Sequence, residues 1–317
     1  MKMSEKTKIL AVTGATASGK SALALELCRR LDGELVSCDS MQIYRGMDIG
    51  TAKPTNAEKQ DVPHHMIDVC EPEVDYSASD YANAAKTVIG EIAARGKLPV
   101  LCGGTGMYLD ALLRPTSFSE ANSADVENIR EELKRFADEN GNGALHDMLR
   151  AVDPDAAEAI HPNNVKRVMR AIEIYRTTGI TKTESDRQSL VGASPYDCTV
   201  ITLDYENRET LYRRIEKRVD AMMDAGLERE VRDLFDSGTL PEGSTAAQAI
   251  GYKEMLSYLR GEGTLIEAVE AIKKNTRNYA KRQITWFRRY NGIRLVADAG
   301  GRVKSASELA DEVIGKM

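Results

Sequence analysis

The stretch Gly14–Ser21 constrains this 317-residue chain more than any other part of its sequence. It fits the pattern G-x-x-x-x-G-K-[ST], a loop whose backbone N–H groups bind phosphate oxygens, provided that a buried strand precedes it and a helix follows. The apolar run Lys8–Thr13 predicts that strand, and the leucine repeat from Leu23 to Leu31 predicts a helix with one apolar face. We therefore expect a phosphate-binding site made of Gly14, Ala15, Thr16, Ala17, Ser18, Gly19, Lys20 and Ser21.

Further apolar runs predict an α/β fold. Strands are expected at Glu34–Cys38, Leu98–Cys102 and Cys198–Leu203. A helix is expected over Tyr81–Arg95, ended by a glycine. Strands that alternate with helices form a parallel sheet flanked by helices, and the phosphate loop makes this core P-loop NTPase-like.

Residues 115–199 lack this strand pattern. The segments Val126–Asn140, Ala144–Ala151 and Ala156–Ile160 instead read as helices separated by polar turns. We therefore expect a helical insertion domain over 115–199 and a catalytic core formed by 1–114 and 200–317, which includes basic helices near the C-terminus.

Polar residues follow the second and third predicted strands, where ligands of a parallel sheet bind. Asp39 stands after the second strand and could hold Mg²⁺ through water, accept a proton, or simply cap a turn. The third strand runs into Gly103–Gly106, where a phosphoryl-transfer enzyme would be expected to carry a carboxylate for Mg²⁺. The absence of a carboxylate at this place indicates that the transferred group is not a phosphoryl group.

Composition narrows the class of protein. Five cysteines, an odd number with no C-x-x-C pair, argue against a disulfide framework or a zinc module. His64 and His65 are adjacent and lack an evident third ligand, so a metal site is not expected there. No apolar run approaches the roughly 20 residues that span a bilayer, and no signal peptide is evident. We expect a cytoplasmic monomer that does not bind membranes.

The net charge of −6 argues mildly against nucleic-acid binding, but the charges are unevenly distributed. Ala271–Arg294 contains eight Lys or Arg residues, no acidic residue and four interleaved aromatics. Such a stretch suits a nucleic-acid backbone with stacked bases, and a solvated helix face is the alternative. A second basic group, Lys166, Arg167 and Arg170, lies in the predicted insertion.

Eight motifs, taken in order, resemble those of the bacterial tRNA dimethylallyltransferase (tRNA isopentenyltransferase) family. The phosphate loop alone is shared with many enzymes, whereas the set in this order is specific. Two small departures are Ala15, where the family usually has proline, and Ser21, where threonine is commoner. The motifs are Gly14–Ser21, Asp39–Tyr44, Asp48–Pro54, Pro63–His65, Gly103–Gly106, His161–Asn164, Gln248–Tyr252 and Lys281–Arg288.

The resemblance implies transfer of a dimethylallyl group from dimethylallyl diphosphate to N6 of an adenosine beside the tRNA anticodon. The loop and Lys20 would hold the diphosphate, and Ser21 would ligate a Mg²⁺ cofactor. Thr105 and Arg218 would support the diphosphate from the other side. Asp39 would take the N6 proton as general base, after the adenine leaves the anticodon stack.

The same resemblance implies an extended contact with the anticodon stem-loop of tRNA. The insertion and the C-terminal basic helices would bind this stem-loop. The implied tRNA-binding residues are Asp39, Ser40, Met41, Gln42, Thr105, Arg130, Lys166, Arg167, Arg170, Gln248, Gly251, Tyr252, Lys281, Arg282, Gln283, Trp286 and Arg288.

Two other functions compete with this one. A small-molecule or nucleotide kinase would need Asp39 as its Mg²⁺ carboxylate and would leave the basic helices without a role. A nucleic-acid-binding ATPase would explain those helices but not the Gly103–Gly106 turn.

Overall fold

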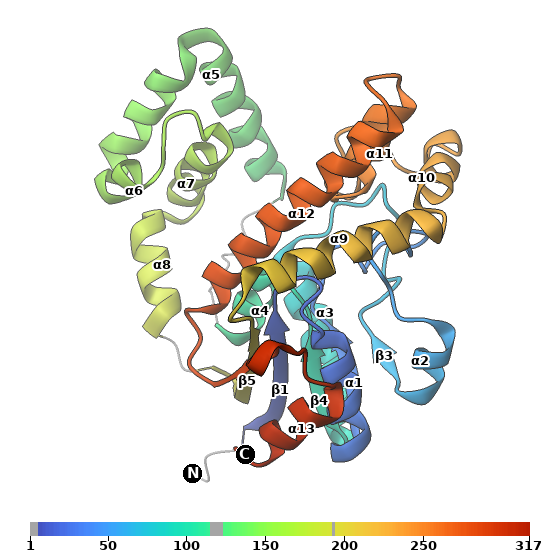
Figure 1. The fold of residues 1–317 in the computed structure, drawn as a ribbon. Helices are drawn as coiled ribbons and strands as arrows, with labels where there is room; N and C mark the ends of the chain where they lie inside the picture. Colours follow the sequence, from blue (N-terminus) through green and yellow to red (C-terminus); the bar gives the residue numbers. More distant parts are fainter. Residues whose placement is uncertain (1–5, 115–122, 192–193) are drawn as a thin grey trace, which may run out of the picture. The chain divides into compact units, whose positions relative to one another are not determined.

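A six-stranded parallel sheet is the centre of the larger of two compact units in the computed structural model (Figure 1). The structure describes residues 6–114, 123–191 and 194–317. The strand order is β3-β2-β4-β1-β5-β6, which confirms the predicted parallel α/β architecture. The strands are β1 (Thr7–Gly14), β2 (Gly33–Ser37), β3 (His64–His65), β4 (Leu98–Cys102), β5 (Tyr196–Asp204) and β6 (Ile293–Val296).

The central strand β1 is apolar on both faces because helices cover both. Leu10 and Val12 face a core formed with α1 (Lys20–Leu31) and α13 (Ala306–Ile314). Ile9 and Ala11 face the opposite core, formed with α3 (Ala78–Ala94), α4 (Gly106–Leu113) and the end of α12 (Leu265–Phe287). The sheet is therefore the middle layer of three, and the loop after β1 opens at its carboxyl edge.

Further helices build a third core beyond that edge. They are α9 (Arg208–Asp224), α10 (Leu227–Asp236), α11 (Tyr252–Leu259) and the first half of α12, and they pack on the segment that follows β2. The short helix α2 (Asn56–Asp61) precedes the edge strand β3. In Figure 1, α9 and α12 run side by side above the carboxyl ends of the strands, and α9 and α12 contact each other. These helices therefore wall the space in front of the phosphate loop.

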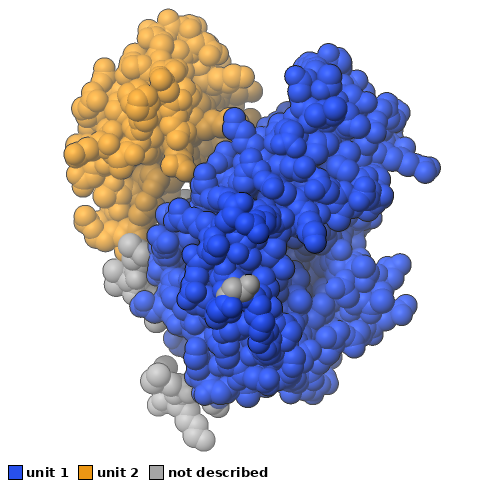
Figure 2. All heavy atoms as spheres, viewed as in Figure 1, with its two compact units in different colours: residues 1–113, 195–317 blue, residues 114–194 orange. Residues whose placement is uncertain are grey.

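The smaller unit, residues 114–194, has a core of its own (Figure 2). Its helices are α5 (Ser123–Val152), α6 (Pro154–Ala159), α7 (Val165–Thr178) and α8 (Lys182–Val191). Gly141 interrupts α5 with φ 84° and ψ 162°, at the turn that the sequence predicts between two helices. Leu133, Leu145, Leu149 and Val168 are fully buried in this unit.

The unit boundaries differ slightly from the predicted domain boundaries. The larger unit comprises residues 1–113 and 195–317, so residues 195–199 do not belong to the helical unit. The reason is β5, which begins at Tyr196 and pairs in parallel with β1 from Thr7 onward. Among the described residues, no helix is both long enough and apolar enough to cross a bilayer.

Candidate active site

The loop Gly14–Ser21 joins β1 to α1 in a conformation that few residues adopt. Ala17 and Gly19 have φ angles of 60° and 98°, in the left-handed region that disfavours an alanine by about 1–2 kcal/mol. Two distant side chains hold this part of the loop. The Arg214 Nε–H donates to the Ala17 carbonyl at 2.8 Å, and the Tyr205 hydroxyl donates to the Ser18 carbonyl at 3.0 Å. The loop is thus fixed by protein contacts in its observed shape.

Two cations face this loop without a carboxylate partner among the described residues. The Lys20 ammonium is buried and donates only to the Ala15 carbonyl, at 3.3 Å. Burial is the largest influence on its pKa and lowers it, and the nearby Arg218 charge lowers it further. Burial likewise lowers the pKa of Arg218. A bound anion would relieve both effects, because it would supply the missing counter-charge.

A cavity of about 120 Å³ lies in front of these cations. It is polar, and its walls include the hydroxyl of Ser21 at the start of α1, the carboxylate of Asp39 after β2, and the Gly103 backbone after β4. The predicted loop residues Lys20 and Ser21 thus meet Asp39 and Arg218 at one place, as the topology of parallel strand ends requires.

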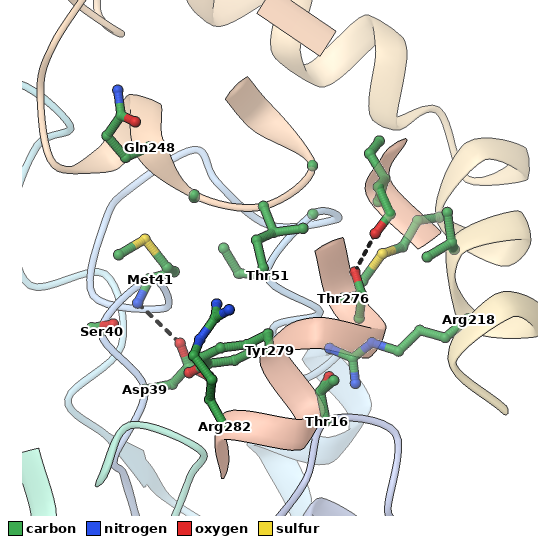
Figure 3. Close-up of a pocket in the computed structure, with 17 residues that line it drawn as sticks. Thr16, Asp39, Ser40, Met41, Thr51, Arg218, Gln248, Thr276, Tyr279 and Arg282 are labelled. Carbon is green, nitrogen blue, oxygen red and sulfur yellow. Dashed lines mark hydrogen bonds between the residues drawn. The ribbon is translucent and has the colours of Figure 1, made fainter. Parts of the chain in front are cut away.

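A second cavity of about 270 Å³ adjoins the first, and its lining is more apolar (Figure 3). The two cavities share Thr16, Asp39, Thr51, Arg218 and Tyr279. The apolar walls come from α9, α12 and the segment before α11: Val219, Met222, Ala249, Ile250 and Ile272. One continuous pocket therefore has a cationic end at the loop and an apolar end under the helices.

Asp39 lies where the two halves of this pocket meet. Its Oδ1 accepts the Met41 backbone N–H at 2.9 Å, which is a turn-capping contact of the kind expected for an aspartate at this place (Figure 3). No hydrogen bond is formed by its Oδ2 to any described residue. One carboxylate oxygen therefore fixes the turn, and the other is available to a ligand.

The neighbouring predicted residues are partly used by the protein itself. Thr105 Oγ1 accepts the Ser40 N–H at 2.9 Å and donates to Ser40 Oγ, and it lines neither cavity. Gln42 bonds to the Ser37 hydroxyl and to the carbonyls of the Thr51–Ala52 turn. These contacts shape the Asp39–Gln42 turn. The diphosphate-supporting role expected for Thr105 has no direct geometric support in the cavity.

The basic stretch Ala271–Arg294, on α12 and just after it, contains two groups of cations. Four of them form ion pairs with carboxylates of the same unit: Lys273 with Asp220, Arg277 with Glu216, Arg289 with Asp110 and Arg294 with Asp204. The other four are exposed and form no such pair with any residue that the structure describes: Lys274, Lys281, Arg282 and Arg288. Arg282 also lines the apolar cavity, with its guanidinium 5.6 Å from the centre of the Tyr279 ring.

Two of the aromatic residues of this stretch pack against the protein itself. Phe287 is 1% exposed in the core against the sheet. Trp286 packs so closely on Gly106 that a Cβ there would come within 2.1 Å of the indole ring. Tyr279 differs from them, because its ring reaches the cavities while its hydroxyl donates to the Gly104 carbonyl at 3.2 Å.

Two residues predicted to contact tRNA are buried. The Gln283 amide accepts the Thr16 N–H at 2.8 Å and donates to the Gly104 carbonyl at 3.0 Å, so it ties α12 to the phosphate loop and to the turn after β4. Tyr252 is 0% exposed, and its hydroxyl donates to Glu230 at 2.6 Å. The predicted contact of Tyr252 with tRNA is therefore wrong for its side chain. The Gln283 side chain is also nearly inaccessible, because the residue is only 3% exposed. Their neighbours Gln248 and Gly251 do line the apolar cavity.

The predicted basic residues of the helical unit also separate by environment. Arg130 and Arg170 both pair with the buried carboxylate of Glu173, Arg130 at 2.7 Å. Lys166 and Arg167, at the start of α7, are exposed and form no ion pair within the described residues. The latter two remain candidates for an external anion.

His64 and His65 have structural partners. His65 Nε2 lies 2.7 Å from a Glu34 carboxylate oxygen, and His64 Nδ1 bonds to the Val62 carbonyl. Within the described residues, no group of three or more His, Cys, Asp or Glu side chains is placed to hold a metal ion.

Sequence reasoning missed several residues that shape the site. Glu230 on α10 accepts hydrogen bonds from the backbone N–H groups of Asp48, Ile49 and Gly50, and thereby holds the loop that carries Thr51. Arg214 and Lys217 lie near the phosphate loop on α9. Arg214, Lys217 and Arg218 are three and four positions apart, so the sequence alone could have predicted that they share one helix face.

Comparison with known proteins identifies a family that covers most of the chain. Residues 42–290 match the family model described as IPP transferase. A tRNA dimethylallyltransferase of Caldanaerobacter subterraneus subsp. tengcongensis is 46% identical over 288 residues, which are 90% of each chain.

Solved structures that resemble this chain have the same kind of name. A tRNA delta(2)-isopentenylpyrophosphate transferase from Staphylococcus epidermidis superposes with a TM-score of 0.71 at 39% identity, over 98% of both chains. A eukaryotic dimethylallyltransferase acting on tRNA gives a TM-score of 0.76 at 30% identity, over 89% of this chain and 70% of the other. The chain belongs to the tRNA dimethylallyltransferase (IPP transferase) family of prenyl-group transferases.

Proposed function

We propose that this protein transfers a dimethylallyl group from dimethylallyl diphosphate to N6 of adenosine 37, next to the tRNA anticodon. The carrying observation is a pocket with Lys20 at one end, Val219, Met222 and Ile272 at the other, and Arg218 lining both parts. Neither cation has a carboxylate partner among the described residues. A diphosphate with a short branched hydrocarbon matches this division of charge. A P-loop NTPase-like core would thus hold a leaving group and not a transferred phosphate.

The cationic end would stabilise the diphosphate as it departs. When the bond between the allylic carbon and the diphosphate oxygen breaks, the electron pair stays on the oxygen. Lys20 and Arg218 line the polar cavity, so together with loop N–H groups they would stabilise the developing charge there. The new bond forms between the same carbon and N6.

Asp39 would accept the proton that N6 loses. An exocyclic amine is a weak nucleophile because its lone pair is delocalised into the ring, so a positioned carboxylate assists it. The contact from Met41 N–H fixes Oδ1, which leaves Oδ2 for the amine. To reach this site the adenine must first leave the anticodon stack.

The residues present also fit Mg²⁺. The Ser21 hydroxyl and the Asp39 carboxylate line the same cavity and are oxygen ligands, directly or through water, of the kind that Mg²⁺ uses. Bound with the diphosphate, Mg²⁺ would neutralise its charge and make it a better leaving group.

The tRNA would bind through exposed cations that form no ion pair among the described residues. We assign this role to Lys281 and Arg282 on α12, Arg288 directly after it, and Lys166 and Arg167 on α7. Phosphate contacts of this kind supply most of the affinity and make it depend on salt.

A direct test is incubation of the protein with labelled dimethylallyl diphosphate, unmodified tRNA and Mg²⁺, in parallel with ATP. Label should enter tRNA at N6 of one adenosine. ATP consumption without label in tRNA would support a kinase or ATPase and overturn the proposal.

For the general base, Asp39→Asn keeps the shape and an oxygen for the Met41 N–H but removes the basic carboxylate. We expect turnover to fall roughly 10²–10⁴-fold, the usual scale for general-base catalysis, with donor affinity little changed. Single-turnover kinetics would measure both. Turnover near that of the unchanged protein would remove Asp39 from this role.

A further inference from the structure

A third cavity, of about 320 Å³, lies beside the phosphate loop, and Asp39 is not among its lining residues. It is lined by Lys20, Ser21 and Arg218, which it shares with the inner polar cavity, and by Arg214, Lys217 and the backbone at Ala17 and Gly19. Four of its side chains are cationic and none is acidic. The inner cavity thus continues outward along α9.

On α9, the cations that line this outer cavity differ from their neighbours in having no ion pair among the described residues. Arg213, one residue away, pairs with Glu209, and Glu216 pairs with Arg277 of α12. Arg214 bonds to the loop carbonyl of Ala17, and neither it nor Lys217 forms an ion pair with any carboxylate that the structure describes. Residues 214, 217 and 218 share one helix face because they are three and four positions apart. Like charges gathered so closely repel one another unless an anion lies among them.

The residues that line each cavity indicate how the diphosphate donor would lie in the pocket. Asp39, where the amine reacts, lines the apolar and inner polar cavities but not the outer one. Lys20 and Arg218 belong to both polar cavities. A diphosphate bound with its reacting carbon beside Asp39 therefore extends past Lys20 and Arg218 toward Arg214 and Lys217.

We infer that Arg214 and Lys217 form an outer subsite that binds the distal phosphate of the donor and of the pyrophosphate released from it. This inference rests on the proposed function for the identity of the donor. The subsite would select a diphosphate over a monophosphate, because only the former reaches it.

The experiment measures binding of inorganic pyrophosphate and orthophosphate to the full chain by calorimetry, with Mg²⁺ at fixed salt. Lys217→Ala should weaken pyrophosphate binding roughly three- to tenfold, since an exposed charge is partly screened, and should change orthophosphate binding less than twofold. Arg213→Ala is the matched control, because it removes one positive charge from the same helix at a side chain that is 74% exposed and paired with Glu209. It should leave both affinities nearly unchanged.

Three outcomes would overturn the inference: no effect of Lys217→Ala, equal effects of Lys217→Ala and Arg213→Ala, or equal losses for the two anions. Equal effects of the two variants would mean that any positive charge on this helix attracts the anion over a distance. Equal losses for the two anions would mean that the variant lowers anion affinity in general. Because no prenyl transfer is measured, failure of the labelled-tRNA assay is distinguishable from failure of this subsite. Arg214→Met provides a second variant, which should give a larger loss because it also removes the bond to the Ala17 carbonyl.

Discussion

A single carboxylate, that of Glu230, holds one side of the pocket. It accepts the N–H groups of Asp48 at 2.9 Å, Ile49 at 2.7 Å and Gly50 at 3.2 Å, together with the Tyr252 hydroxyl. The tyrosine ring lies so close to Gly50 that a Cβ there would come within 2.5 Å of it. The role of Tyr252 is therefore to support the Asp48–Thr51 loop, part of the pocket wall, from inside the core.

Tyr252→Phe should lower stability and leave tRNA affinity unchanged. It removes one hydrogen bond to a charged acceptor, worth about 1.5–3 kcal/mol, while the ring stays packed. Urea unfolding and tRNA filter binding would measure the two quantities. A weaker tRNA complex with an unchanged unfolding midpoint would instead restore the predicted tRNA contact.

At the scale of the element, α12 serves two functions on successive residues. Gln283 points into the protein and joins Thr16 of the phosphate loop to Gly104 after β4. Arg282 points outward and lines the apolar cavity. The helix thus connects the proposed tRNA surface with the proposed diphosphate site.

These adjacent residues should give opposite results. Gln283→Leu leaves the Thr16 N–H and the Gly104 carbonyl without their partner, so thermal stability and pyrophosphate affinity should fall while tRNA affinity changes little. Arg282→Ala should weaken tRNA binding and reduce its salt slope by about one, with the melting temperature nearly unchanged. The two variants serve as controls for each other. Identical profiles would contradict this division of roles.

The sequence predicted what depends on local patterns. The apolar run of β1, the glycine loop and the leucine face of α1 are neighbours in the chain, so their arrangement follows from spacing alone. The two-residue strand β3 was missed because two histidines show no strand alternation. The inward roles of Gln283 and Tyr252 were missed because their partners are 267 and 22 positions away. The structure brings Lys20, Ser21, Asp39 and Arg218 to one cavity, but whether each motif residue faces a ligand or the core depends on the tertiary structure.

At the scale of the whole molecule, a protein with a net charge of −6 still presents exposed cations in both of its units. The helical unit shows the same sorting as α12: Glu173 pairs with Arg130 and Arg170, and leaves Lys166 and Arg167 without an ion pair among the described residues. Net charge alone therefore understates the capacity for RNA binding, since each unit keeps its own exposed cations.

Replacing Lys166 and Arg167 together by alanine should weaken tRNA binding severalfold at low salt and reduce the salt slope, with little change in melting temperature. Arg130→Ala should mainly destabilise the helical unit, because it deprives a buried carboxylate of a partner. Salt-dependent binding curves and thermal melts would compare them. Unchanged tRNA affinity for the double variant would remove α7 from the proposed interface.

The pairing of β1 with β5 and the bond from Thr16 to Gln283 also set an order of events during synthesis. The helical unit has its core within residues 114–194, so all of that core is available before β5 emerges. The phosphate loop is translated near the start. Its contacts with Tyr205 and Arg214 become possible later, and its bond to Gln283 of α12 comes last, on the order of 10–50 s after the loop at ordinary translation rates. Until then the nascent chain carries the anion-binding motif without the structure that shapes it. The loop therefore gains its full set of stabilising contacts only near the end of translation.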